Sequence, residues 1–251
     1  MLFEILSTAE STACAAVMVM VVALAFATTF RGRLAVAAVL ALWFALVLAF
    51  GATGALDNQT SVGPPRIAVA VMLPFALLCA AFFRFESIRI ALFAIPLPTL
   101  VAANVTRILG VDFLLLYAAH RLPAPFAPSA GWGDMFIGAT ALPLAWALAR
   151  YGVRTRALVL IWNALGVADL IAAVGFGATS APGPIQIFAS PPGGVSMTSL
   201  PWLLIPGFLV PIYLALHVAI FYRLSRASDG RAGGLIMSAS EPIGAAARKQ
   251  S

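Results

Sequence analysis

Long apolar runs follow one another along almost the whole chain, and short segments with arginine, proline and glycine separate them. Most runs are about as long as the helix of roughly 20 residues that crosses a bilayer. The pattern therefore predicts an all-α, polytopic membrane bundle of seven transmembrane helices. The predicted spans are Cys14–Phe30, Leu34–Leu56, Ile67–Phe83, Ile90–Tyr117, Met135–Ala149, Ala157–Gly177 and Trp202–Tyr222.

Basic residues gather at one end of the predicted spans. They follow the first, third, fifth and seventh spans, at Arg31, Arg33, Arg84, Arg89, Arg150, Arg154, Arg156, Arg223, Arg226, Arg231, Arg248 and Lys249. Because basic loops stay in the cytoplasm, we expect the amino terminus outside and the carboxyl terminus in the cytoplasm. Residues 1–223 would then form the transmembrane domain. Residues 224–251, rich in Gly, Ala and Ser, would form a flexible cytoplasmic tail.

Composition supports this class and narrows the partners. Hydrophobic residues make up 62% of the chain and charged residues only 10%, whereas a soluble domain is nearer half apolar. The net charge of +6 does not indicate a nucleic-acid partner, because the basic residues flank the spans and do not cover one exposed face. The sole lysine, Lys249, lies in the tail, which argues against a retinal Schiff base. Membrane lipids are the partners that the composition predicts.

The sequence predicts neither a metal site nor a cofactor. Cys14 and Cys79 both lie in apolar segments, so no disulfide framework or CxxC metal motif is available. His120 and His217 are expected at different depths, which does not suit a pair of axial haem ligands. The usual sequence motifs of hydrolases and nucleotide-binding proteins do not occur either.

Charged and polar side chains inside the spans are the candidates for function. An ionised group among lipid tails costs at least a few kcal/mol, so such groups face the bundle interior and pair there. The candidates for binding a ligand or a proton are Arg107, Asp134, Asn163, Asp169, Tyr213 and His217. Helical rise places the arginine and both aspartates in the outer half, with a second polar level in the inner half that Asp169 would connect to the first. Asp112 lies on another helix face and is predicted to be solvated.

Helix periodicity directs both aspartates towards neighbouring helices. Asp134 shares a face with Gly138, Ala141 and Ala145, and Asp169 shares one with Gly166, Ala173 and Gly177. Stripes of small residues are where membrane helices approach closely. We therefore expect an Arg107–Asp134 pair with Asp169 nearby. Two carboxylates facing one arginine would leave one uncompensated, and we assign the proton- or cation-binding role to Asp169. A structural ion pair that only fixes packing is the alternative.

Three other segments carry local expectations. Pro96 and Pro98 predict a kink or break in the fourth span. In "SAGWGDMF", residues 129–136, the glycines predict the start of the fifth helix, whose free backbone donors could hold Asp134 or an anion. The uncharged outer loop Ala178–Pro201 is longer than a tight connection requires. It could be an ordinary loop or a lid.

The run "RILGVDFLLLYAAHRLPAPFAPSAGWGDMFIGATALP", residues 107–143, carries a spaced pattern. Its Arg, Gly, Phe-Leu, Leu-Pro, Phe-Ala and Gly-x-Gly-Asp elements resemble a family of uncharacterised bacterial multi-pass inner-membrane proteins. The resemblance implies a bacterial inner-membrane location and emphasises Arg107 and Asp134. It brings no activity with it.

These observations predict a protein that binds a small solute or a proton in a polar interior and moves it across the bilayer. Two other classes stay open. One is an integral-membrane enzyme that acts on a lipid or isoprenoid with Asp169 or His217 as general base. The other is a sensor or assembly protein without chemistry of its own.

Overall fold

The computed structural model of the 251-residue chain describes residues 12–13, 15–16, 19, 30–56, 66–181, 183–189, 191, 194 and 196–239, the last thirteen by backbone alone. All regular structure in these residues is helical, and they contain no strand. The all-α prediction is confirmed. Most of the predicted first span, Cys14–Phe30, lies outside the described residues.

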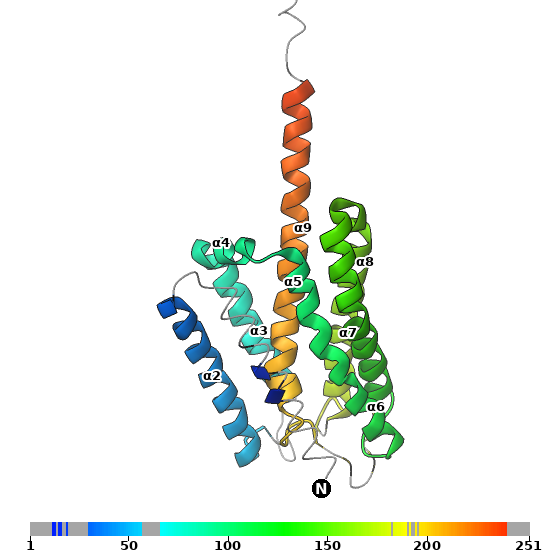
Figure 1. Cartoon of the computed structure of the whole chain (residues 1–251). Coiled ribbons are helices and arrows are strands. Elements are labelled where there is room, and N and C mark those ends of the chain that lie inside the picture. Colours follow the sequence, from blue (N-terminus) through cyan, green and yellow to red (C-terminus); the bar gives the residue numbers. More distant parts are fainter. Residues whose placement is uncertain are drawn as a thin grey trace, which may run out of the picture.

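The helices follow one another as an up-and-down bundle (Figure 1). They are α2 (Phe30–Thr53), α3 (Arg66–Arg84), α4 (Glu86–Ala94), α5 (Leu97–Ala102), the 3-10 helix η1 (Ala103–Leu109), α6 (Gly110–Ala118), α7 (Phe126–Tyr151), the 3-10 turn η2 (Gly152–Thr155), α8 (Arg156–Ser180), the π-helix η3 (Ile205–Leu209) and α9 (Val210–Ala239).

Five helical stretches are long and apolar enough to cross a membrane. They are Phe30–Thr53, Arg66–Arg84, Leu97–Ala118, Phe126–Ser180 and Ile205–Arg226. The fourth stretch contains both α7 and α8, which pack side by side (Figure 1). The chain turns back between them at Gly152, whose φ of 54° is a conformation that glycine adopts without strain.

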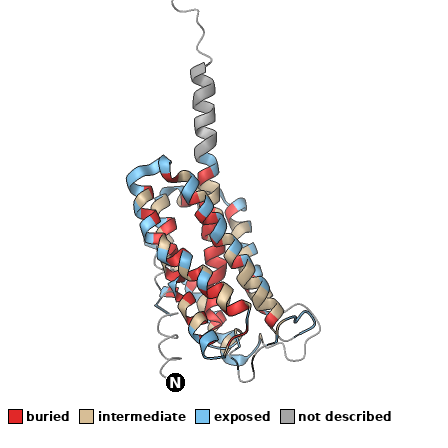
Figure 2. Cartoon of the chain, turned by 90° about the vertical axis from the view of Figure 1, so that its right-hand side faces the viewer, coloured by how far each residue is buried: buried red, intermediate tan, exposed pale blue. Residues whose placement is uncertain are grey.

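The span that contains α9 forms the centre of the bundle. In the apolar span within Ile205–Arg226, 72% of the residues are buried. In the span that α2 forms, only 11% are buried. Figure 2 shows the buried residues concentrated along the inner faces of the helices. The rings of Trp43 and Phe44 in α2 both pack on the ring of Phe208 in η3, at centroid distances of 4.8 and 5.3 Å. α2 is therefore a peripheral helix that is attached to the bundle near η3.

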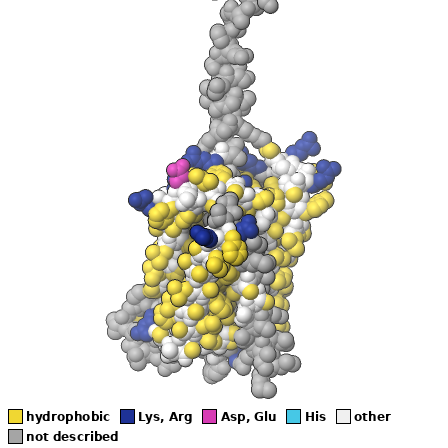
Figure 3. All heavy atoms as spheres, turned by 60° about the vertical axis from the view of Figure 1, so that its left-hand side comes forward, with side chains coloured by type: hydrophobic (Ala, Val, Ile, Leu, Met, Phe, Trp, Pro, Cys, Tyr) yellow, Lys and Arg dark blue, Asp and Glu magenta, His cyan; other side chains and the backbone are white. Residues whose placement is uncertain are grey.

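The ends of the bundle differ in charge. Arginines lie at the carboxyl ends of α3 and α7, in the turn η2 and in the Arg223 region of α9. We call this the arginine-rich end. It contains Arg84, Arg150, Arg154, Arg156 and Arg223. Figure 3 shows most of the visible Lys and Arg side chains towards the end where α9 leaves the bundle, and hydrophobic side chains over the body below. Leu42, Leu77 and Ile171, on three different helices, are examples of large apolar side chains that are exposed. Such a surface suits contact with lipid.

The predicted break in the fourth span is confirmed at the proline pair. α4 ends at Ala94, Ile95 is extended with ψ of 128°, and α5 begins after Pro96 with Pro98 in its first turn. A proline lacks a backbone donor and disfavours helical conformation in the preceding residue, but it fits the first turn of a helix. The predicted start of this span at Ile90 was wrong, because α4 lies across the end of the bundle and the crossing begins at Leu97 (Figure 1).

Two helix boundaries also differ from the sequence prediction. α7 begins at Phe126, well before the predicted Met135, so Asp134 lies inside the helix and not at its amino terminus. The glycines that suggested a helix start are accommodated within α7, where they allow neighbouring segments to approach. α9 continues to Ala239, so the first part of the predicted tail is helical. Residues 240–251 lie outside the described residues.

Candidate functional site

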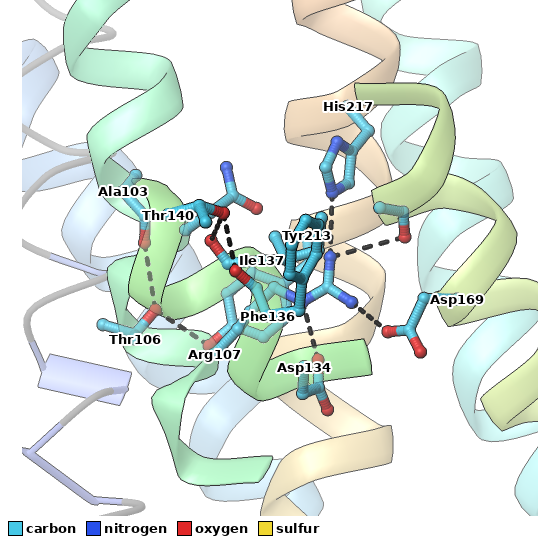
Figure 4. A network of polar contacts seen from close by, with 12 residues as sticks. Ala103, Thr106, Arg107, Asp134, Phe136, Ile137, Thr140, Asp169, Tyr213 and His217 are labelled. Atoms are coloured by element: carbon cyan, nitrogen blue, oxygen red, sulfur yellow. Dashed lines mark hydrogen bonds and ion pairs between the residues drawn. The ribbon is translucent and has the colours of Figure 1, made fainter. Parts of the chain in front are cut away.

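A buried arginine organises the polar interior. Arg107, in η1, is 1% exposed, and its guanidinium reaches two helices (Figure 4). Nε donates to Asp134 Oδ1 of α7 at 2.6 Å, and Nη2 donates to Asp169 Oδ2 of α8. Nη1 donates to the carbonyl of Gly166 at 3.4 Å. The predicted Arg107–Asp134 pair is confirmed, and Asp169 joins it directly.

A histidine on α9 completes the coordination of the guanidinium. His217 is fully buried, and its Nε2 lies 3.0 Å from Arg107 Nη1. Because arginine has only donors, Nε2 must accept, which leaves the ring proton on Nδ1. Nδ1 then donates to Asn163 Oδ1 at 2.7 Å, while Asn163 Nδ2 donates to the backbone carbonyl of His217 at 3.0 Å. The hydrogen bonds thus assign a neutral His217 held in one tautomer by Asn163.

An aromatic hydroxyl anchors the neighbouring turn. The Cζ atom of Arg107 lies 5.8 Å from the ring centroid of Tyr213. The Tyr213 hydroxyl donates to Thr106 Oγ1 at 2.8 Å, and Thr106 in turn donates to the carbonyl of Ala103 at 3.0 Å. Sequence reasoning missed Thr106, although its position next to an intramembrane arginine could have indicated a polar partner. Tyr213 and Thr106 fix η1 against α9.

Glycines set the close approach that the network requires. A Cβ atom on Gly138 would lie 2.5 Å from the backbone nitrogen of Ile108, and one on Gly110 would lie 2.5 Å from Asp134 Cβ. These two glycines allow η1, α6 and α7 to meet without side chains between them. On the other side, Gly133 and Gly166 make room for the side chains of Asp169 and His217.

The stripe predicted beside Asp134 is confirmed, since Gly138, Ala141 and Ala145 are all buried. In α8, Gly166 is buried, but Asp169, Ala173 and Gly177 are only partly buried. The stripe on α8 therefore contacts its neighbours less completely than the one on α7.

Charge is unbalanced within the network. Two carboxylates face one guanidinium and a neutral imidazole, so the described residues of the network carry one acidic charge in excess when both aspartates are ionised. Each aspartate side chain is only 11% exposed. Over the described part of the chain, no group of three or more His, Cys, Asp or Glu residues could hold a metal ion.

A small cavity reaches the network from one side. Its volume is about 50 Å³, and its lining is apolar apart from Asp134. Phe113 and Phe126 contribute to the wall, and Met197, between α8 and η3, also lines it. A cavity of this size exceeds the roughly 10–15 Å³ that one water molecule needs. Whether the predicted outer loop is a lid stays a prediction.

The six predicted site residues belong to one network, but their connection differs from the prediction. Asp134, Asp169 and His217 contact the Arg107 guanidinium, Tyr213 lies beside it, and Asn163 is connected to it through His217. Arg107, and not Asp169, joins the two polar levels, because Nη1 contacts His217 directly. The prediction of a solvated Asp112 was wrong, since that residue is 2% exposed. Asp112 belongs to α6, which packs against α7.

Comparison with known proteins gives a family and no activity. No curated protein and no solved structure matches the chain. Residues 64–225 match the model of a domain of unknown function, DUF8737. The matched region runs from α3 to the Arg223 region of α9, so it contains the whole polar network and leaves out α2. Because the match covers well over half of the sequence, the resemblance to an uncharacterised family is confirmed, and the chain belongs to the DUF8737 family.

Proposed function

We propose that this protein is a multi-pass membrane protein that binds a proton or a small monovalent cation at Asp169 and Asp134 and moves it across the bilayer. The observation that carries the proposal is the second carboxylate. Arg107 compensates one aspartate, and a second ionised aspartate in the interior is costly unless a positive charge accompanies it.

A purely structural ion pair would need only one acidic residue. Replacing such a pair by apolar side chains is often neutral or stabilising, so pairing alone does not explain a second carboxylate on a different helix. Asp134 comes from α7 and Asp169 from α8, and both reach the same guanidinium. A site that alternates between binding and releasing a positive charge accounts for both residues.

The surroundings of the network suit a path in two directions. The cavity that Asp134 lines opens the network towards the outer loop, and Met197 belongs to that wall. His217 contacts Arg107 from the side away from Asp134 (Figure 4). Along α9 it is about 9 Å by helical rise from Arg223 at the arginine-rich end. We assign proton exchange to Asp169, with Arg107 and Asp134 as the organising pair.

The membrane setting belongs to the same proposal. We place the protein in the bacterial inner membrane, with seven spans, the amino terminus outside and the arginine-rich end in the cytoplasm. The five apolar stretches and the hydrophobic surface support a membrane location. The one-sided distribution of arginines supports the orientation.

Asp169→Asn is expected to reduce ion movement at least tenfold. The purified protein would be placed in proteoliposomes that contain a pH-sensitive dye, and proton entry would be driven by an imposed membrane potential. The variant removes the exchanging carboxylate but leaves the Arg107–Asp134 pair, so its elution on size exclusion should match the wild type.

Glu86→Gln is the matched control, because Glu86 is an exposed carboxylate on α4 that lies outside the network. Its proton entry should equal that of the wild type. If wild-type vesicles conduct no protons, the same comparison with sodium, potassium and methylammonium tests whether the protein moves a small monovalent cation instead. Equal flux in wild type and Asp169→Asn, or no flux of any of these ions, would refute the proposal.

A further inference from the structure

A second, larger hollow lies away from the polar network. It is an apolar groove of about 470 Å³ between α2, α3, α4 and α9. Among the described residues that line it, Ser87 and Cys79 are the only polar ones and none is charged. The volume falls within the roughly 300–1,000 Å³ of typical small-molecule sites.

Among the described elements, α2 packs mainly on η3, near one of its ends. Near its carboxyl end, Val47 is buried, and Gly51 approaches the side chains of Leu200 and Leu203. Towards its amino-terminal end, Val36 and Leu40 face the groove instead. Figure 1 shows α2 inclined to α9, with the wider separation at the amino-terminal end of α2. The lining of the groove comes from the amino-terminal half of α2 and the carboxyl-terminal half of α3, so the groove lies towards the arginine-rich end.

Arginines surround this end of the groove. Arg31 and Arg33 begin α2, one turn before the groove-lining Ala35 and Val36, and Arg84 ends α3 two residues after Phe82. Arg89 of α4 donates to the carbonyls of Phe82 and Phe83 and holds α4 over the same end. Against these four arginines, α4 carries one acidic residue, Glu86. The local charge is positive.

We propose that the groove binds one anionic phospholipid, with an acyl chain between α2 and α9 and the phosphate beside Arg31, Arg33 and Arg84. An alkyl chain suits the apolar lining, and a phosphate suits a cluster of guanidinium groups at a membrane surface. The lipid would bridge α2 to the domain that residues 64–225 form, and would occupy the space between the described parts of α2, α3, α4 and α9.

Native mass spectrometry of the full chain tests this inference. The protein would be extracted from membranes that contain equal amounts of phosphatidylglycerol and phosphatidylcholine, and the lipids retained per molecule would be counted. We expect one retained phosphatidylglycerol. The triple variant Arg31→Gln, Arg33→Gln, Arg84→Gln should lower this retention at least tenfold, because it removes the cationic rim and leaves Arg89 in its structural contacts.

Two further variants separate the groove from a general effect of charge. Val36→Trp fills the groove from the peripheral helix and should also abolish retention. Arg154→Gln removes one exposed charge at the same end of the bundle, next to α7 and α8, and should retain the lipid. Equal retention of both lipids, loss in Arg154→Gln comparable to that in the triple variant, or a wild-type protein without lipid would overturn the proposal.

Discussion

Replacing Arg107 with glutamine is expected to destabilise the folded protein by roughly 3–5 kcal/mol, the usual cost of removing one partner from a buried ion pair. Here the loss leaves two facing carboxylates without a cation and His217 Nε2 without its donor. Unfolding in detergent, followed by tryptophan fluorescence, measures the change. Arg154→Gln, which removes an exposed arginine, should be close to neutral.

A compensated variant identifies the cause of this instability. In Arg107→Gln combined with Asp134→Asn and Asp169→Asn, no charged group remains at the three positions of the ion-pair network, and amide groups can still hydrogen-bond to one another. We expect the triple variant to recover a substantial part of the stability that Arg107→Gln loses. If the single substitution unfolds no more easily than the wild type, Arg107 does not hold the interior together.

Gly138→Ala is expected to cost about 1–3 kcal/mol or more, because the added methyl group overpacks a contact between two backbones. Its Cβ atom would lie 2.5 Å from Ile108 N and 2.9 Å from Arg107 C, and neither atom can rotate away as a side chain would. Relief requires η1 to shift from α7, which would disturb the Arg107–Asp134 bond of 2.6 Å. Ion flux should therefore fall together with stability, as measured in the same vesicles and by the same unfolding assay.

Gly175→Ala is the matched control for this substitution. Gly175 is an exposed residue in α8, and a Cβ atom there would meet no atom within 4 Å. Alanine is favoured over glycine in a helix by roughly 0.5–1 kcal/mol, so this variant should be as stable as the wild type or slightly more stable. Equal destabilisation of the two variants would show that the helices tolerate no alanine and that close approach at Gly138 has no special role.

The composition of the site was predictable because the membrane restricts where charge can be placed. An arginine and two aspartates in apolar runs must face the interior, and a period of 3.6 residues identifies the shared faces. These two rules were enough to pair Arg107 with Asp134 and to place Asp169 beside them. The proline rule likewise located the break before Leu97.

Contacts between helices were not predictable in the same way. Helical rise gives the depth of a residue but not the rotation or tilt of its helix, so the direct contact between Arg107 and His217 was missed. The 3-10 winding of η1 changes the rotation per residue around Arg107, and no sequence signal indicated it. The glycines near Asp134 suggested a helix start, although they serve close packing inside α7. The burial of Asp112 depends on the packing of α6 against α7, which a single helix does not reveal.

The central claim is that Arg107 needs one carboxylate for charge balance and that the other is available to bind a positive charge. The unfolding free energies of Asp134→Asn, Asp169→Asn and the double variant test it most directly. Each single variant keeps one aspartate beside Arg107 and should remain within about 1 kcal/mol of the wild type, while the double variant should lose roughly 3–5 kcal/mol. If Asp169→Asn alone destabilises the protein as much as the double variant does, both carboxylates are committed to Arg107 and the claim is wrong.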